Sequence, residues 1–217
     1  MTNPRERVRK LSQEYIARGD LTGWHEQVYA EAQGETANIA WADLIPNPNL
    51  TPWAIPRAAG LSGKRALVVG CGLGDDAEYL AGLGMIVTAF DISPTAIGWC
   101  QKRFSESNVT YVAQDATQLR SEWVGVFDWV FEIYTLQVLP AEIRPRAMTA
   151  VAEYVAAGGH VLMICRGREE ADLPTAVPWP LTHAELNAFT RLNLREDSFD
   201  DFMDGDTRRF RVVYART

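Results

Sequence analysis

The chain has 217 residues, 47% of them hydrophobic and 23% charged, a balance typical of a globular protein with one sizeable core. Acidic residues outnumber basic ones by 28 to 21, and the resulting net charge of -7 argues against a nucleic-acid-binding surface. The three cysteines are scattered and no apolar run is long enough to span a membrane, so we expect a reduced, cytoplasmic protein without a disulfide framework or metal site.

The first 60 residues are expected to form a helical segment ahead of the main fold. Apolar residues at helical spacing, and a proline in a first helical turn, predict three helices: 4–18, 22–32 and 51–59. Residues 39–53, IAWADLIPNPNLTPW, are rich in proline and asparagine and are expected to be a loop that packs through Trp41 and Trp53. We interpret 1–60 as a lid and 61–217 as the core of a single domain, 1–217.

From residue 65 onward, strand and helix patterns alternate along the chain. The expected strands are 65–70, 85–91, 108–115, 127–133 and 159–166, and the expected helices are 75–84, 93–107, 140–157 and 182–192. Two late segments, around 193–199 and 207–215, are expected to be strands with no helix between them. This pattern predicts an α/β, Rossmann-like, doubly wound sheet of seven strands, mostly parallel, with an antiparallel C-terminal hairpin.

The stretch ALVVGCGLGDDAEYL places Gly70, Gly72 and Gly74 where the first strand turns into a helix. Glycines there allow backbone conformations barred to other residues and let a ligand approach the main chain. A dinucleotide fingerprint would need a glycine at position 75, where this chain has Asp75 followed by Asp76. Two carboxylates would repel a pyrophosphate, which favours a cofactor without phosphates. Glycines that serve only the turn and its packing are the alternative.

Three further carboxylates follow later strands at the same predicted edge of the sheet. Asp91 lies 21 residues after Gly70, where a carboxylate can hold a ribose diol, although it could also cap the next helix. Asp115 could accept from an adenine amino group or simply form a turn. Glu132 could hold an ammonium group or face a substrate. Together these features fit a ligand with adenine, ribose and an amino acid, which is S-adenosylmethionine.

Longer motifs resemble the class I S-adenosylmethionine-dependent methyltransferases. LVVGCGLGDDAEYLAGLGMIVTAFDISPTAI carries the form GCGxGxDxxxLAxxGxxVxxxDISPxAI, and FDWVFEIYTLQVLPAEIR, PWPLTHAEL and RRFRVVYAR also match. Within the class, the chain resembles the thiopurine, thiol and halide methyltransferase family and its bacterial relatives. It departs from the pattern at Val68, where many members carry an acid, and at Ile133, where an arginine or tyrosine is common.

The resemblance implies S-adenosylmethionine as cofactor and S-adenosylhomocysteine as product. The resemblance implies that the glycine turn contacts the methionine part of the cofactor and that Asp91 binds the ribose. It also implies that residues after the second and third strands contact the adenine, and that an N-terminal segment with a tryptophan closes over the cofactor. The implied cofactor-binding residues are Trp41, Gly70, Cys71, Gly72, Asp75, Asp91, Ile92, Asp115, Ala116 and Glu132. We expect Cys71 to be small and buried rather than a nucleophile.

Methyl transfer is an in-line displacement that requires alignment of the acceptor and exclusion of water. The activity expected is transfer to a small-molecule acceptor, of which a thiol or another soft nucleophile is one class. The catalytic residue is unknown: Glu132 and Tyr134 are the first candidates, and His25 and His183 are conceivable bases. Aromatic faces from Trp24, Trp41, Tyr134 or Trp179 could stabilise the sulfonium, or these side chains could be ordinary core.

Several questions stay open at this point. Arg166 and Arg168, after the fifth strand, could hold an anionic acceptor or lie in a solvated loop. A non-catalytic S-adenosylmethionine-binding protein is an alternative, and a nicotinamide-dependent oxidoreductase is a weaker one. We expect no nucleic-acid or membrane partner, and either a monomer or a homodimer.

Overall fold

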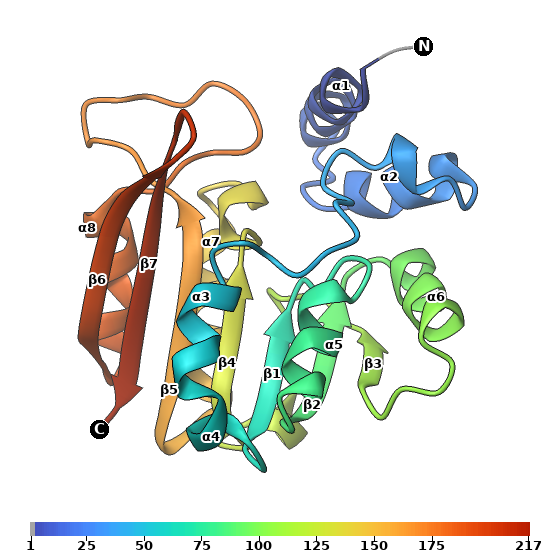
Figure 1. Cartoon of the computed structure of the whole chain (residues 1–217). Helices are drawn as coiled ribbons and strands as arrows, with labels where there is room; N and C mark the ends of the chain where they lie inside the picture. The colour runs from blue at the N-terminus through green and yellow to red at the C-terminus, as the bar shows by residue number, and fades with distance from the viewer. Residues whose placement is uncertain (1–2) are drawn as a thin grey trace.

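The computed structural model describes residues 3–217 and contains one seven-stranded sheet in the order β3-β2-β1-β4-β5-β7-β6 (Figure 1). The strands are β1 Arg65–Val69, β2 Ile86–Asp91, β3 Thr110–Ala113, β4 Phe127–Ile133, β5 Val155–Arg166, β6 Leu194–Asp204 and β7 Thr207–Arg216. The first five strands run parallel, whereas β7 is antiparallel to both β5 and β6. The predicted fold class is confirmed.

The two faces of the sheet are covered by different helices. The α-helices are α1 Pro4–Ala17, α2 Trp24–Ala32, α3 Thr51–Ala54, α4 Ala58–Leu61, α5 Asp75–Gly82, α6 Pro94–Arg103, α7 Arg144–Tyr154 and α8 His183–Leu186. Short 3-10 turns are η1 Thr36–Asn38, η2 Ile55–Arg57, η3 Ser121–Trp123, η4 Leu136–Val138 and η5 Asn187–Leu192. Side chains of α3, α4 and α5 form the core of one face, and those of α7, α8 and η5 form the core of the other. Within residues 3–217, no helix has the length and apolar character needed to cross a membrane.

The predicted N-terminal segment divides into two parts. α1 and α2 pack into a third core cluster, which includes Trp24 and Tyr29 together with Leu73 and Ala96 of the main fold, and Figure 1 shows the two helices beyond the edge of the sheet at which the parallel strands end. By contrast, Trp53 and Leu61 belong to the core on the sheet face, so 51–61 is a covering layer rather than part of a lid. The predicted helix over 51–59 is broken into α3, η2 and α4, because Pro56 has no N–H to continue the helical ladder.

Two other predicted boundaries are wrong for physical reasons. The helix expected over 140–157 ends at Tyr154, and the chain turns extended at Val155, where β5 starts. The pairing of β4 and β5 shifts register between Phe127 and Trp129, so the early part of β5 is joined to β4 irregularly. The helix expected over 182–192 is α only over 183–186 and continues as a 3-10 turn.

The packing of Trp53 yields a first prediction. Its ring is 4% exposed and meets the rings of Trp129 and Phe131 edge-on, with centroids 5.1 and 6.1 Å away. Replacement Trp53→Ala should reduce the free energy of unfolding by about 3–5 kcal/mol, because it leaves a large cavity against the sheet. Ile55→Ala, two residues on and 65% exposed, should change it by less than about 0.5 kcal/mol. Urea denaturation measures both, and equal losses would contradict this packing.

Candidate active site

The glycine turn between β1 and α5 adopts the backbone that its sequence predicts. Gly70 and Gly72 have φ values of 61° and 54°, a region that other residues rarely enter. A Cβ at Gly70 would lie 2.2 Å from the hydroxyl oxygen of Thr135, and a Cβ at Gly72 would lie 3.3 Å from the hydroxyl oxygen of Tyr29. The glycines are therefore required by neighbouring side chains as well as by the turn itself.

Asp91, the last residue of β2, is bonded directly to this turn. Its Oδ2 accepts from the Gly72 backbone N–H at 3.0 Å, and its Oδ1 accepts from the Ser93 N–H at 2.9 Å. Burial is the main cause that raises its pKa to about 6, and the nearby Glu26 carboxylate contributes. A carboxylate has about four acceptor positions, so two remain for a vicinal diol.

Two residues of the turn are placed differently from the prediction. Asp75 forms a two-point ion pair with Arg103 of α6, with N–O distances of 2.8 and 3.1 Å. Its charge is therefore balanced within the protein, which weakens the argument that it repels a pyrophosphate. Cys71 is half-buried rather than buried. A contact with the Cys100 thiol and burial both raise the pKa of Cys71, so it stays a neutral thiol.

The predicted adenine-side residues follow β2 and β3. Ile92 is half-buried and Ala116 is 9% exposed. Asp115 uses its Oδ1 to accept from the backbone N–H and hydroxyl of Thr117 at 2.7 and 2.8 Å, which is the turn-forming role. Burial lowers the pKa of His25 to about 4, and the negative charge of Asp115 opposes part of this lowering. This interaction places α2 near the end of β3.

Glu132 is enclosed in the core, whereas the sequence analysis expected it to hold an ammonium group or to face a substrate. The residue is 0% exposed, and its Oε1 accepts from the backbone N–H groups of Thr135 and Leu136, both at 2.7 Å. Its other oxygen has no hydrogen-bond partner among the described residues. Burial raises the pKa of Glu132 to about 7. The side chain thus organises the turn after β4 from inside the core.

Tyr134, the other catalytic candidate, is half-buried at the same end of β4. Its backbone has a φ of 66°, which is strained for a residue with a bulky side chain. The hydroxyl oxygen accepts from the Asn49 side-chain amide at 3.1 Å, and the guanidinium of Arg209 lies over the ring, 4.8 Å from its centre. Through these contacts Tyr134, at the end of β4, lies between Asn49 of the 44–50 loop and Arg209 of β7.

Aromatic side chains of α2 and of the loop that follows η1 cover the turn. Trp41 is 38% exposed and donates from Nε1 to the Tyr29 hydroxyl at 2.7 Å, beside Gly72. Trp24 is fully buried and stacks on His25, with ring centroids 3.6 Å apart. The Trp24 indole N–H has no hydrogen-bond partner within residues 3–217. These contacts put the predicted tryptophan close to the glycine turn.

Glu26 of α2 is a contact that sequence reasoning missed. Its carboxylate accepts from the hydroxyls of Ser93 and Thr95, at 2.5 and 2.6 Å, and from the Thr95 N–H at 3.2 Å. It therefore lies at the N-terminus of α6, where a negative charge is favourable. No local pattern reveals the role, because the two partners are almost 70 positions away.

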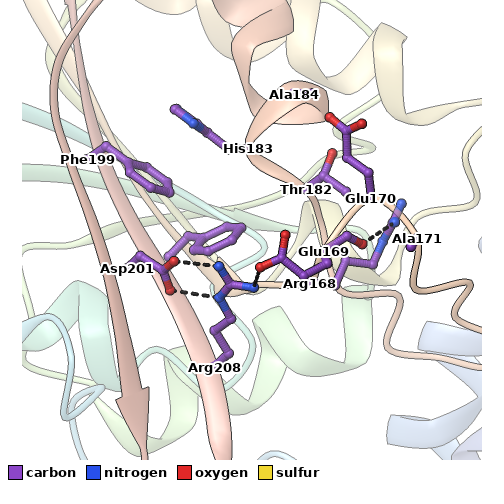
Figure 2. Close-up of a pocket in the computed structure, with 11 residues that line it drawn as sticks. Arg168, Glu169, Glu170, Ala171, Thr182, His183, Ala184, Phe199, Asp201 and Arg208 are labelled. Carbon is purple, nitrogen blue, oxygen red and sulfur yellow. Dashed lines mark hydrogen bonds and ion pairs between the residues drawn. The ribbon is translucent and has the colours of Figure 1, made fainter.

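The remaining histidine and arginine candidates are engaged elsewhere. A hollow of about 470 Å³ beside β6 and β7 is lined by Arg168, Arg208 and His183 among other residues, which Figure 2 draws as sticks. Arg208 is paired with Asp201, Arg168 with Glu185, and His183 with Glu196 at 2.8 Å. These three side chains are therefore engaged by carboxylates of the protein itself. The described residues also contain no group of three or more His, Cys, Asp or Glu side chains that could hold a metal ion.

Comparisons with known proteins show that the central part of the chain is similar to methyltransferases. Residues 66–159 match the family model described as "Methyltransferase domain". The ubiquinone biosynthesis O-methyltransferase of Aromatoleum aromaticum is 36% identical over 117 residues, which is 53% of this chain and 49% of that protein. The chain spans about half the length of the curated relatives it matches.

Solved structures extend the likeness to the whole fold. The N-methyltransferase NodS from Bradyrhizobium japonicum, solved in complex with S-adenosyl-L-homocysteine, has a TM-score of 0.68 at 20% identity and covers 87% of this chain and 98% of its own. The Burkholderia thailandensis 1,6-didemethyltoxoflavin-N1-methyltransferase has the same TM-score at 16% identity, over 100% and 92% of the two chains. The predicted Rossmann-like fold is confirmed, and these methyltransferases share it. The narrower thiopurine, thiol and halide resemblance stays a prediction.

The buried Glu132 predicts a pH-dependent stability. Because its pKa rises on folding from 4.5 to about 7, the folded state holds the proton more tightly, and the free energy of unfolding falls as the pH increases through this window. The free energy of unfolding of Glu132→Gln should equal that of the wild type near pH 5. At pH 8 it should exceed the wild-type value by on the order of 2–3 kcal/mol. Glu132→Ala should be less stable at both pH values, since it leaves two N–H groups unpaired. Denaturation of the three proteins at both pH values measures this, and a constant difference between Gln and Glu would contradict it.

The Glu26 contact predicts the mobility of α2. Glu26→Ala removes three hydrogen bonds to the start of α6, so amide hydrogen exchange over residues 24–32 should become at least tenfold faster. Glu35→Ala, an exposed carboxylate outside this contact, should leave exchange unchanged. Exchange in α7 serves as the internal reference. Equal protection in both variants would show that Glu26 does not hold α2 against the core.

Proposed function

We propose that this chain, whose residues 66–159 match a methyltransferase domain, transfers methyl groups from S-adenosylmethionine to a small-molecule acceptor. The observation that carries the proposal is the bond between the Asp91 carboxylate and the Gly72 N–H. It supports a role for the Asp91 carboxylate as a diol acceptor beside a turn that has glycine at positions 70, 72 and 74, at the carboxyl ends of β1 and β2, where ligands of such sheets bind. The residues present fit the cofactor, which supplies an electrophilic methyl group when bound.

The chain's own residues would divide the work by position. Gly70 and Gly72 would leave room for the amino-acid half, Asp91 would accept from the ribose hydroxyls, and Ile92 and Ala116 would pack around the adenine. Tyr29 and Trp41 would cover the turn, exclude water and present aromatic faces to a sulfonium. Because the Tyr29 hydroxyl already lies against Gly72, entry of the cofactor would require α2 to move outward.

The acceptor proposed is a soft nucleophile such as a thiol. Glu132 is enclosed in the core, and burial lowers the pKa of His25 to about 4, so neither would serve as a strong base at neutral pH. A thiolate needs no such base. A phenol is the competing acceptor, because the matched relatives are named O-methyltransferases, and Tyr134 is the candidate left to assist it.

The remaining expectations are part of the same proposal. A single domain would act on a small molecule in the cytoplasm, without nucleic acid or membrane, as a monomer or homodimer. The alternatives are a protein that binds S-adenosylmethionine without turnover and a nicotinamide-dependent oxidoreductase. Assays of a panel of thiols and phenols with radiolabelled S-adenosylmethionine test whether the protein binds the cofactor without turnover. Titration with NADH tests whether it is a nicotinamide-dependent oxidoreductase.

The test of the proposed function is a calorimetric titration with S-adenosylhomocysteine and S-adenosylmethionine. Wild type should bind both, and Asp91→Asn should weaken binding by roughly 10- to 100-fold, because a hydrogen bond to a charged group contributes about 1.5–3 kcal/mol. Asp128→Asn is the matched control, since the Asp128 carboxylate also accepts from a backbone N–H, that of Arg65 at 2.8 Å, away from the turn. Asp128→Asn should bind as wild type does. No binding to either compound, or equal binding by both variants, would contradict the proposal.

A further inference from the structure

Two arginines face each other across paired strands at the carboxyl edge of the sheet. Arg166 is the last residue of β5, and it lies directly opposite Arg209 in the antiparallel register with β7. Like charges directly opposite on neighbouring strands are destabilising. The backbone of Arg166 is held firmly, because its N–H donates to the Gln137 side chain at 2.7 Å, and the Gln137 carbonyl accepts from the Trp179 N–H at 2.7 Å.

The Arg166 guanidinium has no carboxylate to balance it. It is half-buried, and no ion pair or side-chain hydrogen bond joins it to another described residue. Its neighbour Arg209 pairs with Asp204 at 3.2 Å and stacks on Tyr134. Asp204 also accepts from Asn49, so this one carboxylate is shared. The groups that act on the charge of Arg166 are three guanidinium groups and the Tyr134 hydroxyl, and none of them is a carboxylate.

Helix α1 adds two more guanidinium groups to the same region. Arg5 and Arg9 are one helical turn apart, so they share a face of α1. Burial and the charges of Arg209, Arg5 and Arg9 all lower the pKa of Arg166, so each of these three guanidinium groups acts on the Arg166 charge. In Figure 1, α1 lies next to α2, beyond the edge of the sheet at which the parallel strands end. Arg5 and Arg9 have no ion pair within residues 3–217.

This arrangement differs from that of the neighbouring arginines on the same strands and loop. Arg168 is paired with Glu185, Arg208 with Asp201, and Arg211 with Asp200. A chain with a net charge of -7 has ample carboxylates to pair with Arg166 as well. A concentration of four arginines with one shared carboxylate costs stability, and an anionic ligand would offset that cost.

We propose that Arg166 and Arg209, with Arg5 and Arg9 from α1, bind a carboxylate on the methyl acceptor. β5 is separated from β1 by β4 alone, so this site lies roughly 10 Å across the sheet from the glycine turn. That span suits an acceptor whose nucleophile points to the turn while its carboxylate meets the planar forks of the arginines. The inference rests on the proposed function and narrows the acceptor to an anionic small molecule.

The test compares matched acids and amides as probes. Protein saturated with S-adenosylhomocysteine is titrated by calorimetry with 4-mercaptobenzoate, 4-mercaptobenzamide, 4-hydroxybenzoate and 4-hydroxybenzamide. We expect at least one acid to bind at least tenfold more tightly than its amide. Arg166→Gln should bring the ratio near one by weakening the acid alone, and Arg166→Lys should give an intermediate ratio. Lys10→Gln, which removes an exposed charge from α1 outside the cluster, should keep the wild-type ratio.

The outcomes separate this inference from the proposed function. Two results would overturn the anion site and leave the methyltransferase proposal unaffected, provided that S-adenosylhomocysteine binds tightly. In one, no acid binds more tightly than its amide; in the other, the preference for the acid persists in Arg166→Gln. A loss of S-adenosylhomocysteine affinity in Arg166→Gln would assign the arginines to the cofactor's own carboxylate and also overturn it. If S-adenosylhomocysteine does not bind, the probes are titrated alone. An acid preference that depends on Arg166 would then support the anion site while the methyltransferase proposal falls.

Thermal unfolding distinguishes a binding role from a structural one. Without ligand, Arg166→Gln should melt at the same temperature as wild type or higher, because it relieves repulsion with Arg209. Addition of the preferred acid at constant ionic strength should raise the melting temperature of wild type and not that of the variant. A melting temperature several degrees below wild type in the unliganded variant would show that Arg166 supports the fold and would overturn the inference.

Discussion

The bond between the Asp91 carboxylate and the Gly72 backbone is the constraint on which the candidate site depends. It joins the end of β2 to the turn after β1, and the second oxygen fixes the start of the next loop through Ser93. Because the residue is buried, its two backbone donors compensate part of the desolvation of a charge. The glycine turn, the N-terminus of α6 and the covering α2 all take their places around this one side chain.

Carboxylates at the edge of the sheet are otherwise used to assemble the protein itself. Asp75 binds Arg103, Glu26 binds the start of α6, and Glu132 binds backbone N–H groups after β4. Asp91 differs from them in accepting from the backbone of a turn that has glycine at positions 70, 72 and 74. The distinction between a structural and a ligand-binding carboxylate therefore lies in the neighbouring residues and not in the carboxylate itself.

The sequence predicted the parts of the site that depend on local spacing. Gly70, Gly72 and Asp91 were placed together because strand and helix lengths are regular, and the antiparallel hairpin followed from the lack of a helix before β7. Residues whose roles depend on distant partners could not be recovered in the same way. Arg103 is 28 positions from Asp75, and Glu26 is 67 positions from Ser93. The early start of β5 was hidden because Val155 and the alanines after it suit either a helix or a strand.

Helix α1 contributes to two regions at once, and this has a thermodynamic consequence. It packs with α2, whose Tyr29 covers the glycine turn, and it carries Arg5 and Arg9 toward the end of β5. A ligand held by those arginines would favour the closed position of both helices, and closure would in turn retain a cofactor at the turn. Linkage makes this effect reciprocal. Two ligands that never touch the same residue would then bind cooperatively, and an anionic product would slow release of the spent cofactor.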